Sequence, residues 1–466
     1  MLTNVRKDAS RLDAGAIGAR LDRLPATRCI WEWVGLLSLG GFFEFYDLFL
    51  TGYIAPGLVK EHILTATTPG LFGTTGIASF AAALFAGLFV GTMLVSFVAD
   101  RFGRRMVFTA SLLWYAGAAA IMALQTDAFG LNLWRFIAGI GIGVELVTIA
   151  TYVSELVPKT VRGRAFAVNQ TIEFAAVPAV ALVSWLLVPT SLGGVSGWRW
   201  VVLIGSVSAV AVWFIRRRVP ESPRWLAAHG RLDEAERVLV ALEQRVAAES
   251  GRALPPPGLP EPVIPGGSLM EALRPPYAGR TAMLVVFNIF QTVGFYGFAN
   301  WVPTLLVKQG ITLTSSLLYT FVIALAAPLG PLLGIGFADK IERKWLIVMA
   351  AGCIAVFGLL FSQATATAAI IGCGVMLTLS SNIMAFAFHA YQAEVYPTRI
   401  RAVAFGFVYS FSRISAAFSG FLIAFFLRGF GTLGVFAFIA GSMVIVMAAI
   451  ATGPAVNNHS LEQISH

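Results

Sequence analysis

The chain has 466 residues, of which 57% are hydrophobic and only 12% are charged, whereas an ordinary soluble domain has about 25% charged residues. This composition excludes a soluble globular enzyme and predicts a helical protein that lies in lipid. The net charge of +9 has to be assigned loop by loop before it can indicate an acidic partner.

Twelve apolar segments are long enough to cross about 30 Å of hydrocarbon as helices. In the first part of the chain they cover residues 34–56, 74–98, 107–125, 131–154, 164–188 and 198–216. In the second part they cover residues 281–306, 314–337, 345–363, 367–393, 402–426 and 432–452. The sequence therefore predicts an all-α membrane protein with twelve transmembrane helices.

The predicted helices form two groups of six, separated by a polar segment. We expect polar tails at 1–30 and 454–466, six-helix bundles at 31–216 and 281–453, and a linker at 217–280. The stretch from Leu232 to Val246 in this linker has an amphipathic pattern that predicts a surface helix.

Basic residues gather on one side of the predicted spans. If the N-terminus is cytoplasmic, 27 of the 33 Lys and Arg residues lie in cytoplasmic loops and tails. The outer loops and outer helix ends then hold only Lys60, Arg199, Lys308 and Arg428. Cytoplasmic loops of membrane proteins are rich in Lys and Arg, so we expect both termini in the cytoplasm.

Two motifs recur at one constant spacing. Asp100 begins D-R-F-G-R-R after the second span, and Asp339 begins D-K-I-E-R-K 239 residues later, after the eighth. Glu155 and Glu394, at the ends of the fourth and tenth spans, have the same spacing. The spacing indicates an internal duplication of six-helix units in parallel orientation. The functional site is then expected between the halves.

Three motifs carry a resemblance to a known superfamily: D-R-x-G-R-R from Asp100, R-x-x-x-G-x-G from Arg135, and P-E-S-P-R-W-L from Pro220. Over essentially its whole length the chain resembles the major facilitator superfamily. The third motif is similar to that of sugar porters, organic anion and cation transporters, and bacterial nicotinate and aromatic-acid proton symporters. The segments around Tyr296 and Glu394 look most like the last group.

This resemblance implies two pseudo-symmetric six-helix bundles that give alternating access to a central site. It implies a proton-coupled symporter in a bacterial inner membrane, acting as a monomer without a cofactor or a nucleic-acid partner. The expected substrate is a small organic acid, in particular an aromatic or heteroaromatic carboxylate such as nicotinate or a hydroxybenzoate. A sugar or polyol symporter and an organic cation or zwitterion transporter are the alternatives.

Ionisable residues inside a span are costly and often functional, and Asp47 and Arg135 are two of them. Both fall in the outer halves of their helices, where they can meet. In proton-coupled sugar porters an Asp and an Arg at matching positions form the coupling pair, and the resemblance implies the same role here. Contact with Arg favours the ionised Asp, and separation in an apolar site lets it bind a proton. The alternative is a permanent ion pair that only holds two helices together.

Arg413 lies near the middle of the eleventh span and has no acidic residue within seven positions along its helix. A guanidinium is a planar, always charged, bidentate donor for a carboxylate. Organic anion transporters carry an Arg in the corresponding stretch, so Arg413 predicts a substrate with a carboxylate. The alternative is an internal partner, Glu44 or Glu173.

The resemblance to sugar porters places Gln170, Gln291, Tyr296 and His389 around the central cavity. Glu44 and His389 depart from the sugar-porter pattern and favour an ionic or zwitterionic ligand. His389 is a candidate for titration near neutral pH, or alternatively a neutral, hydrogen-bonded residue. Aromatic residues at this level either stack on a flat substrate or only pack the bundle: Phe43, Tyr46, Phe287, Phe290 and Phe295.

Charged residues at the cytoplasmic helix ends predict an inner gate. Such charges can form salt bridges between the halves, which in this family stabilise the outward-open state, with the segment around Arg224 docking as a latch. The alternative is that these charges serve topology alone. The gate residues are Asp100, Arg101, Arg104, Arg105, Glu155, Arg162, Arg224, Asp339, Arg343, Lys344, Glu394 and Arg401.

Other classes of protein find little support in the sequence. No His, Cys and Asp grouping has the spacing of a catalytic or metal site, and no G-x-x-x-x-G-K-[ST] loop indicates ATP drive. Cys29, Cys353 and Cys373 imply no disulfide framework. A sensor would call for a large signalling domain or tail, and the polar stretch after residue 453 is short.

Overall fold

The computed structural model describes residues 15–65, 67–71, 75–207, 217–258, 268–338 and 341–455, with backbone only at 94–100, 334–338, 393, 398–399 and 402. Long helices dominate this part of the chain, as predicted. Ten segments within it are long and apolar enough to cross a membrane, and one of them, 49 residues long, covers two predicted spans. The one sheet in these ranges is a short hairpin of β1 (Ser191–Leu192) and β2 (Val195–Ser196).

The helices of the first half follow the predicted spans closely. They are α2 (Arg28–Lys60), α3 (Gly76–Phe102), α4 (Arg104–Met122), α5 (Ala128–Leu156), α6 (Arg162–Leu187) and α7 (Gly197–Ser206). The sixth predicted span continues to residue 216, beyond the described end of α7. Asp127 caps α5, because its side chain accepts a hydrogen bond from the backbone N–H of Gly130.

The second half is more interrupted than its hydropathy predicts. Its helices are α12 (Ala278–Ala299), α13 (Val302–Lys308), α14 (Leu313–Ala324), α15 (Leu329–Ala338), α16 (Arg343–Gln363), α17 (Thr367–Glu394) and α18 (Thr398–Ala451). Pro303 stands in the first turn of α13 and Pro328 precedes α15, and a proline interrupts helical hydrogen bonding. The last two predicted spans are one run that turns at Gly431, where φ is 67°.

The linker contributes α9 (Pro223–Ala228), α10 (Leu232–Ser250) and α11 (Leu269–Ala272). The predicted amphipathic helix is confirmed in α10, which buries Ala235, Leu239, Leu242 and Val246 on one face. Residues 15–22 form a further helix, which the sequence analysis treated only as part of a polar tail. Its Ile17 and Leu21 are buried against the first half.

Each half has its own hydrophobic core. Within the first half α3 and α5 pack at backbone contact, because a Cβ at Gly139 would lie 2.4 Å from the Leu84 carbonyl oxygen, and one at Gly143 would lie 2.3 Å from that of Leu88. Small residues permit this approach where no hydrophobic force drives helices together. The Gly-rich R-x-x-x-G-x-G segment is therefore a packing surface.

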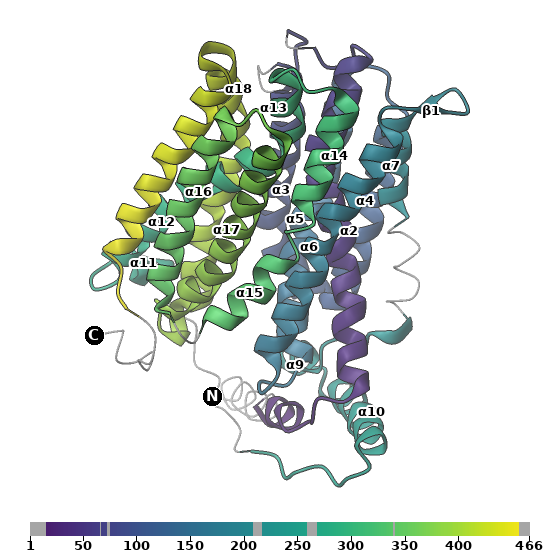
Figure 1. Cartoon of the computed structure of the whole chain (residues 1–466). Coiled ribbons are helices and arrows are strands. Elements are labelled where there is room, and N and C mark those ends of the chain that lie inside the picture. The colour runs from purple at the N-terminus through teal and green to yellow at the C-terminus, as the bar shows by residue number, and fades with distance from the viewer. Residues whose placement is uncertain are drawn as a thin grey trace.

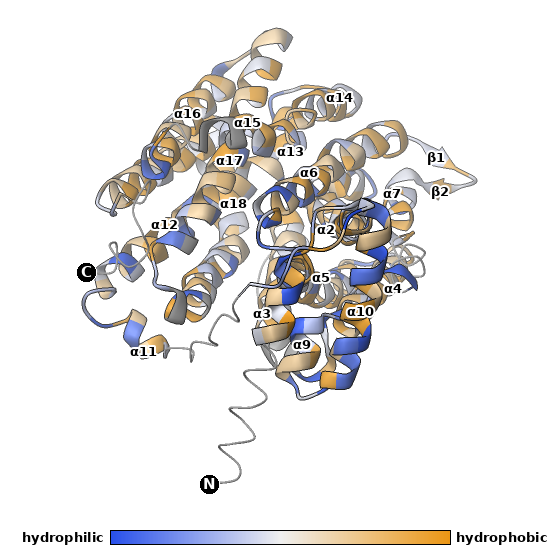
Figure 2. Ribbon diagram, turned by 90° about the horizontal axis from the view of Figure 1, so that it is seen from below, coloured by the Kyte–Doolittle hydropathy of each residue, from blue (hydrophilic) through white to orange (hydrophobic). Residues whose placement is uncertain are grey.

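The two halves stand side by side, with α9 and α10 at one end, here called the α10 end, and the β1–β2 hairpin at the other, the hairpin end (Figure 1). Seen from the α10 end, hydrophilic residues gather on α10, while the helices of both halves are largely hydrophobic (Figure 2). Large apolar side chains are exposed on the outer helices, as lipid contact requires; examples are Leu113, Phe129, Leu186, Met349, Val356 and Phe425.

Candidate functional site

Asp47 and Arg135 form a buried ion pair between α2 and α5. Arg135 donates from Nη1 to Asp47 Oδ2 at 2.8 Å and from Nη2 to the Asp47 carbonyl oxygen at 2.5 Å. Its Nη2 and Nε also donate to Thr51 Oγ1, at 2.6 and 3.1 Å. The guanidinium lies 5.4 Å from the ring centroid of Phe80. The two side chains that the sequence analysis placed near each other are thus in contact and excluded from solvent.

Arg413 is buried in α18 and is held by tyrosine hydroxyls rather than by a carboxylate. Its Nη2 donates to Tyr409 at 2.7 Å and its Nη1 donates to Tyr296 at 3.2 Å. The guanidinium also lies 4.7 Å from the ring centroid of Tyr409. Among the described side chains Arg413 makes no ion pair, so the expected internal partners, Glu44 and Glu173, are not in contact with it here.

His389 and Gln291 lie in the second half on α17 and α12. His389 Nδ1 is 2.6 Å from the carbonyl oxygen of Ala385, and a carbonyl only accepts, so Nδ1 carries the hydrogen and leaves Nε2 as an acceptor. The His389 ring lies 5.8 Å from that of Tyr409. Gln291 donates to Thr292 Oγ1 at 3.1 Å. His389 therefore joins the Arg413 group through Tyr409, whereas Gln291 bonds to its own helix.

Three glutamates from three helices of the first half occupy one region. Glu44 (α2) and Glu145 (α5) are buried, and Glu173 (α6) is partly exposed. Glu173 accepts a hydrogen bond from Asn169 Nδ2 at 2.6 Å. Gln170 lies half-buried on the same helix. The sequence analysis did not single out Glu145, although it is an ionisable residue in a predicted span, the criterion that selected Asp47.

Aromatic side chains close the space between the halves. The Phe295 ring lies 6.3 Å from Phe49 and from Phe174 of the first half, and Tyr296 lies 4.8 Å from Phe85. This position of Phe295 between the halves is compatible with its expected role of stacking on a flat substrate.

Two of the other expected aromatic residues serve packing. Tyr46 is buried and donates to the Val201 carbonyl at 3.0 Å. Phe287 is buried against Phe388, at 4.7 Å between ring centroids. Neither is free to stack on a substrate, because its apolar face is already covered inside one half.

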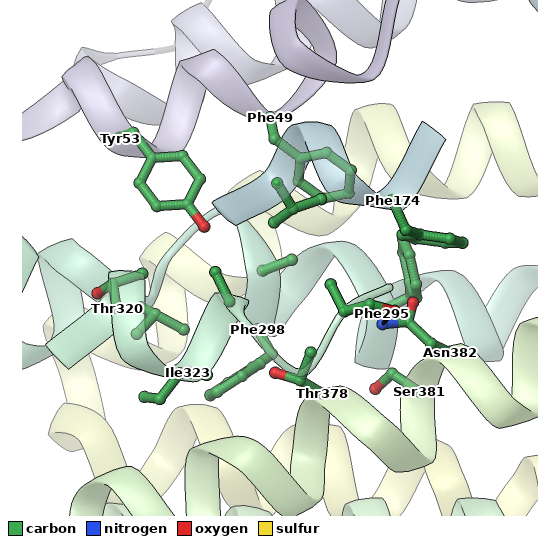
Figure 3. Close-up of a pocket in the computed structure, with 15 residues that line it drawn as sticks. Phe49, Tyr53, Phe174, Phe295, Phe298, Thr320, Ile323, Thr378, Ser381 and Asn382 are labelled. Carbon is green, nitrogen blue, oxygen red and sulfur yellow. Dashed lines mark hydrogen bonds between the residues drawn. The ribbon is translucent and has the colours of Figure 1, made fainter. Parts of the chain in front are cut away.

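A pocket lies between the halves towards the hairpin end, with Phe49, Tyr53 and Phe174 of the first half facing α12 to α14 and α17 of the second (Figure 3). Its polar lining comes from Thr320, Thr378, Ser381 and Asn382, together with the Tyr53 hydroxyl. The ionisable residues described above do not line it. Aromatic residues of both halves line the pocket, which lies next to those ionisable residues.

At the α10 end the ion pairs between described side chains lie within one half. Arg104 pairs with Glu155 at 3.1 Å in the first half, and Arg343 pairs with Glu394 in the second. The salt bridges expected between the halves are not among them. Arg101 lies over Phe102, Lys344 donates to the Gly453 carbonyl and Arg401 to that of Tyr396. The Asp100 side chain and Asp339 lie outside the described residues.

The P-E-S-P-R-W-L segment packs onto the first half, and its expected role as a latch stays a prediction. Glu221 accepts hydrogen bonds from the backbone N–H groups of Arg104 and Arg105 at 3.0 and 3.2 Å, which caps the N-terminus of α4. Trp225 is buried. Arg224 pairs with Asp22 at 2.8 Å, and the same carboxylate lies 3.6 Å from Arg162. The sequence analysis missed Asp22, which joins this segment to the helix at residues 15–22.

Tyr409 is the other functional candidate that the sequence analysis missed. It stands one helical turn before Arg413, at i and i+4, where side chains on one helix meet. That spacing was available in the sequence, but it does not distinguish a hydroxyl that binds Arg413 from one that faces lipid.

Comparison with known proteins places this site in context. Residues 33–466 match the family described as "Sugar (and other) transporter". The chain is 30% identical to the inner membrane metabolite transport protein YdjE of Escherichia coli over 464 residues, which cover 96% of this chain and 98% of that protein. It is 29% identical to the niacin transporter NiaP of Acinetobacter baylyi over 398 residues, or 85% and 87% of the two chains.

The fold is similar to that of the xylose transporter XylE from E. coli in a partially occluded inward-open conformation. The TM-score is 0.71 at 19% identity, with 92% of this chain and 99% of that chain covered. The expected arrangement of two six-helix bundles is confirmed by this likeness.

Proposed function

The chain belongs to the sugar (and other) transporter family of the major facilitator superfamily, and from that premise we propose that it is a proton-coupled symporter of a small aromatic or heteroaromatic carboxylate. Family membership makes it a multi-pass membrane transporter rather than an enzyme. Nicotinate and hydroxybenzoates are the first candidates for the substrate.

Arg413 is the observation that carries this proposal. A buried guanidinium needs an anion or several acceptors, because an uncompensated charge in low dielectric is costly. Two tyrosine hydroxyls are weak substitutes for a carboxylate, and Arg413 Nε has no acceptor among the described residues. A substrate carboxylate supplies two charged acceptors in the plane of the guanidinium. The site is thus better matched to an anion than to a neutral sugar.

The ring of the substrate is the second part of the proposal. Phe49, Phe174, Phe295 and Tyr296 come from both halves, and aromatic faces favour a flat ring. Likeness to a niacin transporter supports a heteroaromatic acid. The sugar, polyol, and organic cation or zwitterion alternatives keep the same fold but leave Arg413 without its anion.

Proton coupling is assigned to Asp47 and Arg135. The pair is buried and joins two helices of one half, so its separation exposes a carboxylate to an apolar site where proton binding replaces the lost cation. Proton symport of an anion then moves no net negative charge. We place the chain in a bacterial inner membrane as a monomer, with the α10 end in the cytoplasm, because most Lys and Arg residues belong to that side.

Substitution at Arg413 tests the substrate class. Arg413→Ala is expected to reduce nicotinate uptake in proteoliposomes at least about tenfold, since a charge-assisted hydrogen bond contributes about 1.5–3 kcal/mol. Arg413→Lys keeps the charge but loses the bidentate geometry, so intermediate uptake is expected. Arg237→Ala, an exposed substitution on α10, is the matched control and should transport normally.

A binding screen separates the alternatives. Thermal stability of the purified chain is measured with nicotinate, benzoate and hydroxybenzoates, with sugars, and with permanent organic cations, at two pH values. Stabilisation is expected from the acids and should disappear in Arg413→Ala. Stabilisation by sugars or cations alone would remove the carboxylate proposal, as would undiminished uptake in both Arg413 variants.

A further inference from the structure

Glu44, Glu145 and Glu173 are brought together by two glycines of α2. A Cβ at Gly40 would lie 3.0 Å from Glu145 Oε1, and a Cβ at Gly41 would lie 2.7 Å from Glu173 Oε1. Glu44 follows these glycines by four and three positions, so it lies one turn along the same helix face. Carboxyl groups from α5 and α6 therefore approach α2 next to the carboxyl that α2 itself carries. These three residues are called the carboxyl trio.

The carboxyl trio is poorly supplied with hydrogen-bond donors. Both oxygens of Glu145 and Oε1 of Glu44 are buried and have no partner among the described residues. Glu145 is fully buried and Glu44 is 1% exposed. Only Glu173 accepts a hydrogen bond, from Asn169, whose own Oδ1 accepts from Ser38. Three ionised carboxylates in such a place repel one another and lose their hydration.

Among the described residues of the second half, one cation interacts electrostatically with the carboxyl trio. Arg413 is the positive charge that interacts electrostatically with Glu44, and Tyr409, which binds Arg413, interacts with Glu44 and Glu173. Asp47 is also on α2, but its charge is matched by Arg135 in direct contact. His389 lies near Arg413, and its described hydrogen-bond partner is the Ala385 carbonyl oxygen. The charge state of the trio therefore depends on Arg413, which is also the proposed anchor of the substrate.

We propose that the carboxyl trio is a second proton-binding site, distinct from Asp47, which takes up one proton when an anionic substrate binds Arg413. The proposal rests on the function proposed above. A substrate carboxylate neutralises Arg413 and so removes the positive charge that supports an ionised Glu44. The proton comes from solution and forms an O–H bond on a carboxylate oxygen of the trio, and no other bond changes.

The geometry gives this proton access from solvent and neighbouring carboxyl groups that share it. Glu173 is partly exposed, so the trio is in contact with solvent at one member while Glu145 stays dry. Interacting carboxyls share their titration, so the proton belongs to the group rather than to one residue. Proton binding by the trio in the first half then accompanies anion binding at Arg413 in the second half. Coupling at this site needs no movement of the Asp47–Arg135 pair.

Infrared spectroscopy of the substrate-free, purified chain tests the site without any assumption about the substrate. The carbonyl stretch of a protonated carboxyl is measured at neutral pH. Arg413→Gln removes the cation and should increase this band by the equivalent of one carboxyl, whereas Arg413→Lys should not. In the Arg413→Gln background, Glu44→Gln should abolish the increase. Asp47→Asn in that background is the matched control and should leave the increase in place.

Two outcomes overturn the proposal: an unchanged band in Arg413→Gln, or an increase that survives Glu44→Gln, Glu145→Gln and Glu173→Gln in turn. A measurement on the unaltered chain guards against misfolded variants. Nicotinate added in weak buffer with a pH dye should cause uptake of about one proton per bound molecule at a pH where the trio is ionised. Binding without proton uptake contradicts the site, whereas absence of nicotinate binding contradicts the proposed function and leaves the infrared result standing.

Discussion

The buried charges of Asp47 and Arg413 are compensated in two different ways. Asp47 has a cation in direct contact, 2.8 Å from its carboxylate, so the charge is compensated within one half. Among the described residues, Arg413 has only hydroxyl groups within hydrogen-bond distance. A paired charge is suited to release and recapture of a proton, and an under-compensated charge is suited to binding an external ion. The two residues therefore fit the proton and the anionic substrate of the proposed symport.

Asp47→Asn is expected to separate proton drive from substrate binding. The amide keeps the size of the side chain but binds no proton, so accumulation of nicotinate against its gradient in response to an imposed pH gradient should fall by the share that Asp47 carries, while the proton taken up by the carboxyl trio is unaffected. Counterflow exchange of nicotinate should persist, because Arg413 and the aromatic residues are unchanged. Both are measured in proteoliposomes with radiolabelled substrate.

Loss of both activities in Asp47→Asn would favour the alternative of a permanent, structural ion pair. Asp127→Asn is a matched control, because Asp127 caps the N-terminus of α5 and Asn is an equally good capping residue.

At the scale of elements, the segments at the α10 end form a single assembly on the first half. Glu221 caps α4, Asp22 joins residues 15–22 to Arg224, and Glu243 of α10 accepts hydrogen bonds from Arg20 and Arg23. Partial burial raises the pKa of Glu243, but the hydrogen bonds from these two arginines outweigh it and hold the pKa below its usual value. Hydrogen bonds and ion pairs of charged side chains thereby hold together helices that are far apart in sequence.

Glu243→Gln is expected to loosen the helix at residues 15–22 by about 1 kcal/mol, because the partly exposed pair is screened by solvent. Hydrogen exchange of residues 15–23 should become roughly fivefold faster. Since the pKa of Glu243 is lowered in the folded chain, its stabilising effect is present above the usual glutamate pKa and is lost as the pH falls through the lowered value. The unaltered chain should approach the behaviour of Glu243→Gln in acid.

The control for this prediction is Glu234→Gln, on the same helix. Among the described residues, Glu234 pairs with its exposed neighbour Arg231 and not with the helix at 15–22, so exchange at residues 15–23 should not change. Equal effects of the two substitutions would show that the ion pairs of Arg20 and Arg23 do not hold this helix.

At the scale of the whole molecule, the two halves meet closely towards the hairpin end. Gly52 of α2 packs against Asn300 of the second half, where an added Cβ would lie 2.3 Å from the Asn300 carbonyl oxygen. Arg428 donates to Thr75 across the halves at 3.0 Å. These contacts join the halves at the hairpin end. At the α10 end, Arg104 pairs with Glu155 and Arg343 with Glu394, each pair within one half, among the side chains that the structure describes.

Gly52→Val is expected to prevent close approach of the halves at the hairpin end. Backbone cannot yield to the added methyl groups as a flexible side chain can, so conformations open at that end should gain population. Labelling of Thr304→Cys by a membrane-impermeant thiol reagent from the hairpin side, in a background without other cysteines, should become several times faster, and transport should fall.

Gly372→Val is the matched control, because a Cβ at Gly372 meets nothing within 4 Å. Unchanged labelling in Gly52→Val would mean that this contact does not govern opening at the hairpin end.

The sequence by itself determined the spans, the internal duplication, the amphipathic α10 and the presence of costly charges inside helices, because apolar length and periodicity are properties of a local stretch of chain. It also placed Asp47 and Arg135 at one level. Only the tertiary structure decided which groups touch, since helix rotation and lateral packing depend on residues far apart in sequence: Tyr296 and Arg413 are 117 positions apart. The glycine face that gathers the carboxyl trio, the tyrosines around Arg413 and the internal pairs at the α10 end all arise from contacts of that kind.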